Sequence, residues 1–225
     1  MRKIYTSILF FLTIITLISC KKEEVDDTAY TAVAVVNASP TAATYDVYLG
    51  ATKLNTAALP LGGGIAYVQQ VAGNYDLKFT VAGRGESVYT KSVSLAQNSF
   101  QTFFLVGSPS SFDGVFAVDN LAATSTTQAF VRFVNLSPDA PALTLGITGG
   151  AAVGTSQSFK GVGSFVPVAT GAQSFELKDN SSVVRATLTG VNLVANGYYT
   201  VIARGLVTPV SSADLPLAAQ LIVTK

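Results

Sequence analysis

The chain has 225 residues, with 14 Lys and Arg against 13 Asp and Glu, one Cys and no His. Without His there is no Ser-His-Asp triad or histidine general base, and one Cys excludes an internal disulfide and a thiolate metal cluster. The formal net charge of +1 gives no electrostatic basis for a nucleic-acid partner, whereas 49% hydrophobic residues suffice for a folded core.

The chain begins with two basic residues, Arg2 and Lys3, followed by an apolar run over residues 4–19. As a helix this run would reach about 24 Å, less than the ~30 Å hydrocarbon core of a bilayer, so it predicts a cleaved signal peptide over residues 1–19. The end of the run, Leu17-Ile18-Ser19-Cys20, resembles the lipobox of bacterial lipoproteins. We therefore expect lipidation of Cys20. The alternative is a cysteine packed as a small hydrophobe, which conflicts with the four charged residues that follow it.

Residues 20–28 carry charge without an apolar pattern, and we expect a lipidated flexible tether. Lys21-Lys22-Glu23-Glu24 resembles the lysine-then-acidic signal that sends lipoproteins to the outer face of the outer membrane in one Gram-negative phylum. The alternative is a tether selected only for its polarity. Thr28 lies in Asp27-Thr28-Ala29, which resembles an O-glycosylation sequon of the same phylum. These resemblances imply a lipid-anchored protein of the cell outer membrane, exposed at the surface.

The rest of the chain predicts β-strands. Residues 75–81 alternate strictly, which places Leu77 and Phe79 on an inner face and Asp76, Lys78 and Thr80 in solvent. Turn signals such as Gly73-Asn74 separate short apolar runs. The strands expected in the first half lie near 31–37, 45–50, 65–71, 75–81, 87–95 and 100–106, with a further short strand within 108–121, and 218–224 is expected to close the second half.

The two halves of this region repeat each other at a fixed offset of 98 residues. Fourteen identities occur without a gap, among them Asn37 with Asn135 and Gly73 with Gly171. This period exceeds that of solenoid repeats and matches a domain. We therefore predict an all-β protein with two tandem antiparallel β-sandwich domains, Ig-like or transthyretin-like. The first covers residues 29–121, a linker 122–127 and the second 128–225.

Each half opens with a Val-Asn-x-Ser-Pro motif, at residues 36–40 and 134–138. This motif, with Tyr45-Asp46-Val47-Tyr48 in the first half and Asn196-Gly197-Tyr198-Tyr199 in the second, resembles the bacterial domain-of-unknown-function 4397 family. The resemblance implies two copies of a secreted or surface-anchored β-sandwich and no established activity. Asn37 and Asn135 are either polar binding residues or, as we expect, residues whose side chains bind loop backbone.

Carboxylates are the remaining route to acid–base catalysis, and a glycosidase needs two of them facing each other across a cleft. The repeat aligns Asp46 with Thr144 and Asp76 with Ser174, so it indicates no such pair. Asp113-Gly114 and Asp119-Asn120 lack the spacing of an EF-hand loop. Gly62-Gly63-Gly64 has no Lys-Ser/Thr after it, and we expect a hairpin end. We therefore predict no catalytic residue, no cofactor and no metal site.

Two classes of function remain open. One is a non-catalytic binding or adhesion module for a glycan or an envelope protein, and the other is a structural spacer or accessory subunit without its own ligand. Exposed Tyr48, Tyr89 and Phe112 would favour glycan binding, because sugars stack on aromatic faces. The alternative is that Tyr48 and Tyr89 are cross-strand pairing residues. The sequence names no ligand.

Overall fold

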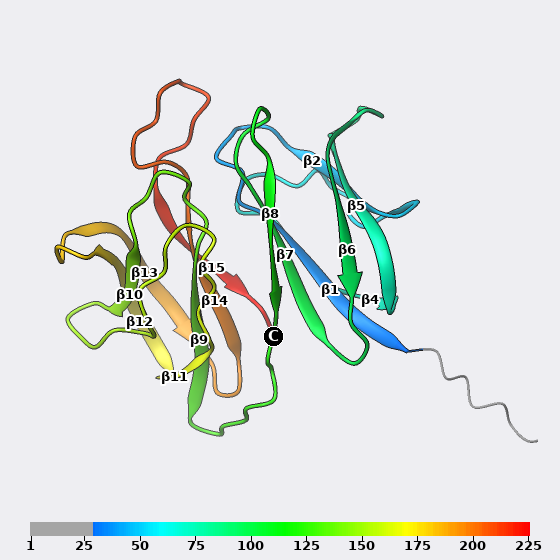
Figure 1. Ribbon diagram of the computed structural model, residues 1–225. Coiled ribbons are helices and arrows are strands. Elements are labelled where there is room, and N and C mark those ends of the chain that lie inside the picture. Colours follow the sequence, from blue (N-terminus) through cyan, green and yellow to red (C-terminus); the bar gives the residue numbers. More distant parts are fainter. Residues whose placement is uncertain (1–28) are drawn as a thin grey trace, which may run out of the picture.

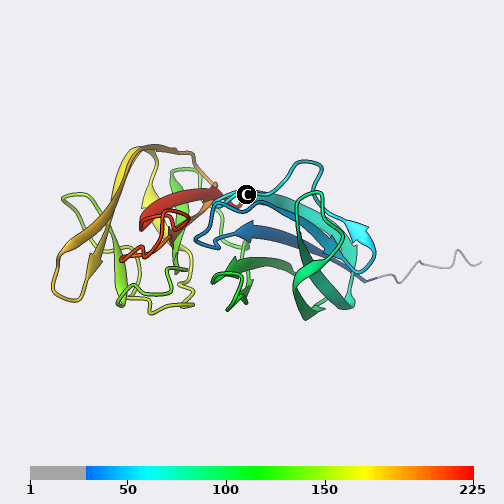
Figure 2. The ribbon, with the colours of Figure 1, turned by 90° about the horizontal axis from the view of Figure 1, so that it is seen from above.

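The computed structural model describes residues 29–225, and everything in this range folds as strands and loops. Its strands form two β-sandwiches, which lie side by side in Figures 1 and 2. The predicted signal peptide, Cys20, the Lys21–Glu24 segment and Thr28 lie outside the described residues. Residues 29–225 contain no helix that is long and apolar enough to cross a membrane.

The first sandwich contains eight strands in two sheets. One sheet has the order β4-β1-β7-β8 and the other β3-β2-β5-β6. The strands are β1 (Tyr30–Asn37), β2 (Tyr45–Leu49), β3 (Thr52–Lys53), β4 (Gly64–Val71), β5 (Gly73–Val81), β6 (Ser87–Leu95), β7 (Phe100–Val106) and β8 (Asp113–Val118). Every strand expected in this half is present. The two-residue β3 was not predicted, because it is too short to show an apolar period.

The second sandwich contains seven strands, in sheets of order β11-β9-β14-β15 and β10-β12-β13. The strands are β9 (Gln128–Asn135), β10 (Leu143–Ile147), β11 (Val166–Ala169), β12 (Gly171–Asp179), β13 (Val184–Leu193), β14 (Tyr198–Arg204) and β15 (Ala218–Val223). The predicted all-β architecture of two sandwiches is confirmed. The predicted closing strand over 218–224 is also present, as β15.

One pair of strands in each sandwich departs from the antiparallel prediction. Strands β1 and β7 are parallel, with Ala32 opposite Phe100, and β9 and β14 are parallel, with Phe130 opposite Tyr198. Between the two strands of each pair, the chain forms strands of the facing sheet. The second strand of the pair then begins at the same end of the sheet as the first, which makes the two parallel. The two registers differ by the 98 residues that separate the repeated motifs in the sequence.

Each sandwich has its own apolar core, in which the two inner faces meet. Leu77, Phe79 and Phe103 are buried in the first core, and Leu145, Phe175 and Leu177 in the second. The alternation predicted for 75–81 is confirmed at Leu77 and Phe79. It is wrong at Thr80, which is buried rather than solvent-exposed.

The outer faces of sheets β4-β1-β7-β8 and β11-β9-β14-β15 pack against each other. On the central strands of these sheets, the side chains that point away from each sandwich's own core form a third apolar cluster, which includes Val36, Phe104, Val134 and Ile202. Strands β1, β7, β9 and β14 are therefore buried on both faces over most of their length. We call this contact between the sandwiches the seam.

Candidate functional site

The seam joins equivalent patches of the two sandwiches. Val36 and Val134 both belong to its apolar cluster, as do Phe104 and Ile202, and the members of each pair are 98 residues apart. The same patch of each sandwich thus faces its counterpart, which is the arrangement of a two-fold, self-complementary dimer interface.

A buried ion pair breaks this equivalence. Asp119, which follows β8, lies 2.6 Å (Oδ1) from Nη1 of Arg132 on β9, and both side chains are almost fully buried. The other carboxylate oxygen, Oδ2, accepts hydrogen bonds from the Tyr67 hydroxyl and from Thr102 Oγ1 (2.5 Å). The Arg132 guanidinium donates from Nε to Thr200 Oγ1 at 2.9 Å. These five side chains bind the two sandwiches to each other by charge as well as by apolar contact.

Burial beside the ion pair raises the pKa of one neighbouring side chain. Burial, and then the hydrogen bond to Asp119, raise the pKa of Tyr67 well above its usual range. Tyr67 therefore remains a neutral hydrogen-bond donor to the carboxylate at physiological pH.

Arg132 has donors that these contacts leave over. Its Nη2 is buried and has no hydrogen-bond partner among the described residues, and its Cζ lies 4.5 Å from the centroid of the Phe165 ring. A guanidinium carries five N–H donors, so the Asp119 and Thr200 contacts do not satisfy it.

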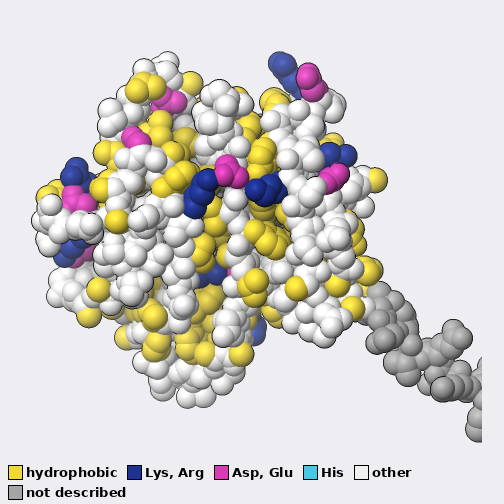
Figure 3. Space-filling view, in the orientation of Figure 1, with side chains coloured by type: hydrophobic (Ala, Val, Ile, Leu, Met, Phe, Trp, Pro, Cys, Tyr) yellow, Lys and Arg dark blue, Asp and Glu magenta, His cyan; other side chains and the backbone are white. Residues whose placement is uncertain are grey.

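Two pockets open at the seam. One, of about 200 Å³, is lined mostly by apolar groups of β1, β4 and β7 and by the end of β15. The other, of about 280 Å³, is lined by Arg132 together with Val118, Asn120, Ala123, Val162, Gly163, Ser164 and Phe165. Figure 3 shows hydrophobic side chains along the hollow between the sandwiches, with basic and acidic side chains inside and across it. We call the pocket of about 280 Å³ the Arg132 pocket.

Contacts across the surface also fix the seam. Lys160 of the second sandwich bonds Asp113 at the start of β8, and Lys91 Nζ lies 3.6 Å from the same carboxylate. The Lys160 hydrogen bond is the main cause of a lowered Asp113 pKa. On another part of the seam, Gln220 Nε2 donates to the Gly62 carbonyl at 2.7 Å. Asp113 and Asp119, weighed above as calcium ligands, are thus both held by cationic side chains.

The asparagines of the Val-Asn-x-Ser-Pro motif hold loop backbone, as expected. Asn37 is fully buried; its Oδ1 accepts from Ser39 N at 3.0 Å and its Nδ2 donates to the Leu59 carbonyl at 3.2 Å. Asn135 repeats this arrangement with Ser137 N and the Gln157 carbonyl. Both side-chain amides are hydrogen-bonded to backbone groups of their own sandwich, so the motif has a structural role.

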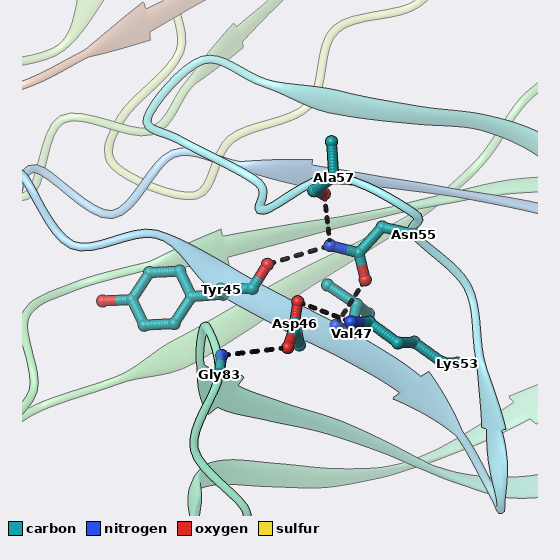
Figure 4. Close-up of polar contacts among 7 residues, drawn as sticks. All are labelled: Tyr45, Asp46, Val47, Lys53, Asn55, Ala57 and Gly83. Atoms are coloured by element: carbon teal, nitrogen blue, oxygen red, sulfur yellow. Dashed lines mark hydrogen bonds and ion pairs between the residues drawn. The ribbon is translucent and has the colours of Figure 1, made fainter.

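The Tyr45-Asp46-Val47-Tyr48 segment is the centre of a second polar cluster (Figure 4). Asn55 accepts from Val47 N at 2.8 Å and donates to the carbonyls of Tyr45 and Ala57 at 2.9 and 2.8 Å. Asp46 pairs with Lys53 Nζ at 2.9 Å and accepts from Gly83 N at 3.2 Å. The Lys53 hydrogen bond is the largest cause of a lowered Asp46 pKa. This cluster fastens β2 to its neighbouring loops.

The three aromatic residues considered for sugar stacking do not form an exposed patch. Tyr89 and Phe112 pack against the first core with ring centroids 6.1 Å apart, and burial raises the pKa of Tyr89 to about 12. Tyr89 also lies opposite Phe79, which is the cross-strand pairing reading. Tyr48 is half-buried on β2 opposite Lys78. The loop 54–63 that ends at Gly62 and Gly63 passes from one sheet to the other, so the expected hairpin end is wrong.

Most carboxylates of the described range already have partners. Besides Asp46, Asp113 and Asp119, the acids with ion pairs are Glu176 and Asp179, and those that accept from backbone N–H or a hydroxyl are Asp76, Asp139 and Asp214. Within 29–225 no three His, Cys, Asp or Glu side chains group as a metal site would require.

The sequence reading missed Arg132, although a signal was present. Arg132 is the single charge in Ala129-Phe130-Val131-Arg132-Phe133-Val134, a segment with the apolar character of a strand buried on both faces. Its counterpart 98 residues earlier is Ala34. A charge in such a strand requires a buried partner.

The fold and the seam define an all-β protein of two packed sandwiches. The family model described as "Domain of unknown function (DUF4397)" matches residues 31–146, and the chain belongs to this family. The match covers the first sandwich from the second residue of β1 and extends through β9 and most of β10.

Two solved structures resemble the chain weakly. The Bacillus anthracis TIE protein is 14% identical over 79% of this chain, with a TM-score of 0.25, and this chain covers 34% of its length. CBMbc (family CBM26) from Eubacterium rectale Amy13K, solved in complex with maltoheptaose, is 9% identical over 87% of this chain and 97% of its own, with a TM-score of 0.27. No curated protein sequence matches the chain. These low TM-scores give no support to a shared function.

Proposed function

We propose that the protein is a surface-exposed lipoprotein of the outer membrane that acts as a non-catalytic binding or adhesion module. The observation that carries the binding role is the Arg132 pocket, where two sandwiches held by a common apolar cluster leave a buried guanidinium with an unpartnered Nη2. Most of the acids of the described range, by contrast, are paired with lysines, arginines, backbone N–H groups or hydroxyls. This distribution favours ligand binding rather than catalysis.

The proposed location rests on the sequence. A lipid at Cys20 would anchor the chain in the membrane, Lys21, Lys22, Glu23 and Glu24 would direct it outward, and Thr28 would be the O-glycan acceptor. The proposed units are a signal peptide over 1–19, a tether over 20–28, sandwiches over 29–121 and 128–225, and a linker over 122–127. Strand β8 ends at Val118 and β9 begins at Gln128, which is compatible with a linker between them.

We also propose that the two sandwiches are tandem copies of the family's domain. The shared strand order, the two parallel registers separated by 98 residues and the paired seam residues support this proposal. A glycan or an envelope protein is the proposed partner. Since Tyr89 and Phe112 belong to the core, the seam replaces the predicted aromatic residues as the proposed binding place.

The anchor and the display are tested separately. Cys20→Ser should abolish lipid labelling and leave an uncleaved or soluble protein; normal labelling of this variant would refute lipidation. Protease shaving of intact cells should digest the wild type. Replacing Lys21–Glu24 with alanines should protect it while leaving acylation intact, and a wild type digested only after lysis would refute surface display.

A structural spacer is the second candidate function, favoured by the shared apolar cluster that joins the sandwiches into one block. A glycan array and a cell-surface pull-down with the full chain separate the two candidates. Specific capture supports the binding module, and a folded protein that captures nothing supports the spacer.

A further inference from the structure

We propose that one end of the molecule lies against the surface of the bilayer that holds the lipid anchor. The inference rests on the proposed lipidation of Cys20, and it adds which part of the folded protein contacts the lipid. We call this part the anchor end. It lies at the lower side of Figure 1 and contains the start of β1 together with the loops 96–99, 119–127 and 194–197 and the residues 224–225.

Hydrogen bonds join the loops of the anchor end across both sandwiches. Asn98 N donates to the Tyr30 carbonyl at 2.8 Å, where β1 begins. The loop 119–127 leads from the first sandwich to the second, and its Ala123 carbonyl accepts from the Tyr198 hydroxyl at the start of β14. Both sandwiches therefore present this end on the same side of the molecule.

The anchor end is nearly free of charged side chains. Among its residues only Asp119 and Lys225 carry a charge, and Asp119 is buried in its ion pair with Arg132. The loops at the opposite end of the sandwiches contain five charged residues that are partly or fully exposed: Arg84, Glu86, Asp139, Lys160 and Asp214. Figure 3 shows most charged side chains of this face away from its lower side. Anionic headgroups repel exposed carboxylates, so an end with one exposed cation and no exposed acid suits a phospholipid surface.

Exposed apolar side chains gather at the same end. Of the ten exposed large hydrophobic side chains in residues 29–225, six lie at the anchor end or next to it: Tyr30, Val71, Phe100, Val118, Val194 and Val223. Val71 lies opposite Tyr30, and Phe100 lies opposite Ala32, which shares the face of β1 that carries Tyr30. An apolar ring with a polar hydroxyl, flanked by Phe and Val, is suited to the boundary between headgroups and acyl chains.

The place at which the chain enters the fold favours lipid over a protein partner at this end. Residues 20–28 would separate the lipid on Cys20 from β1, and a chain of this length spans at most about 30 Å even when fully extended. The anchor end therefore stays close to the bilayer at a high effective concentration, where weak apolar contacts are enough to hold it. The opposite end lies one strand length farther from the anchor.

Quenching by spin-labelled lipid tests this orientation. Cys20 is the one cysteine of the chain, and the proposed lipid occupies its sulfur, so an introduced cysteine takes a nitrobenzoxadiazole label selectively. The label is placed at Ala96→Cys in the anchor end or at Ser212→Cys in the opposite end, both exposed positions. The lipidated protein is studied in vesicles of phosphatidylethanolamine and phosphatidylglycerol. We expect lipids that are spin-labelled near the headgroup to quench the label at position 96 and not the label at position 212.

Two pairs of substitutions identify the contact. Tyr30→Glu with Phe100→Glu places two acids at the headgroups and should abolish the quenching at position 96, with lipid attachment and Tm unchanged. Val88→Glu with Val210→Glu is the matched control, because both valines are exposed away from the anchor end. The control should leave the quenching as it is in the wild type.

Lipid labelling and vesicle flotation of the same samples separate this orientation from the anchor itself. For protein that is lipidated and floats, three results would overturn the orientation and leave the lipoprotein assignment standing: no quenching at position 96, equal quenching at both positions, or quenching that survives Tyr30→Glu with Phe100→Glu. Protection of position 96 from aqueous iodide without quenching by lipid would indicate a protein contact, such as a second copy, and would also overturn it. Protein that takes no lipid and does not float would refute the anchor and the orientation together.

Discussion

At the scale of single residues, several buried polar side chains stabilise the fold by hydrogen-bonding backbone groups. Asn55 is the clearest case, because one amide bonds three backbone groups around β2 (Figure 4). Buried backbone N–H and C=O groups need partners, and a short side chain that reaches several of them replaces a missing strand.

Asn55→Ala should lower the free energy of unfolding by about 2–4 kcal/mol. The change leaves a buried Val47 N–H and two backbone carbonyls without hydrogen-bond partners. Denaturant titration measures this change. Asn74→Ala, at an exposed position on β5, is the matched control and should change stability by less than about 0.5 kcal/mol. Equal effects of the two changes would contradict this role for Asn55.

Asp46 gives a pH-dependent prediction. The pairing with Lys53 lowers its pKa below the ordinary value of 3.8, so its contribution to stability is fully present above that value and is lost as the pH falls through the folded-state pKa. Asp46→Asn lacks this contribution at every pH. The stability difference between wild type and variant should therefore be constant from pH 7 to about 5 and shrink below pH 3.8; a difference that grows on acidification would contradict the pairing.

The roles of single residues could be predicted from the sequence where a local motif indicated them. The two Val-Asn-x-Ser-Pro motifs correctly indicated loop-binding asparagines, because Asn before a Ser-Pro turn has a local partner. Arg132 and Asp119 were not paired from sequence, because a contact between residues on different strands has no local signature.

At the scale of elements, the strands were predictable and their neighbours were not. Period-two alternation and glycine turns located β1, β2 and β4–β7 within about two residues. The parallel pairs β1–β7 and β9–β14 depend on which sheet the chain enters after each turn, and side-chain alternation carries no record of that choice.

Leu77→Ala tests the core assignment of β5. Leu77 is buried in the first core, so truncation should cost about 2–5 kcal/mol in unfolding free energy. Val88→Ala on the neighbouring β6, where 37% of the side chain is exposed, should cost much less. Denaturation midpoints of the two variants give the comparison, and a tolerated Leu77→Ala would contradict the predicted facing of this strand.

At the scale of the whole molecule, the seam decides the behaviour of the protein. An outer sheet face normally turns to water, yet β1, β7, β9 and β14 carry apolar residues on both faces, and the second set meets across the seam. The near-continuous apolar runs of these strands were visible in the sequence. They were read only as strands of separate sandwiches, because one-face alternation was the expected pattern.

The seam predicts that both sandwiches unfold together. Sandwiches that share an apolar cluster and a buried ion pair stabilise each other, so the wild type should show one calorimetric transition with equal calorimetric and van't Hoff enthalpies. Phe104→Asp places a charge in the seam cluster on the face of β7 that points away from its own core, so it should separate the transition into two. Phe100→Asp changes the same residue type on the same face of β7 at an exposed position, and should leave one transition. Two transitions in the wild type, or one in folded Phe104→Asp, would show that the sandwiches are not coupled through the seam.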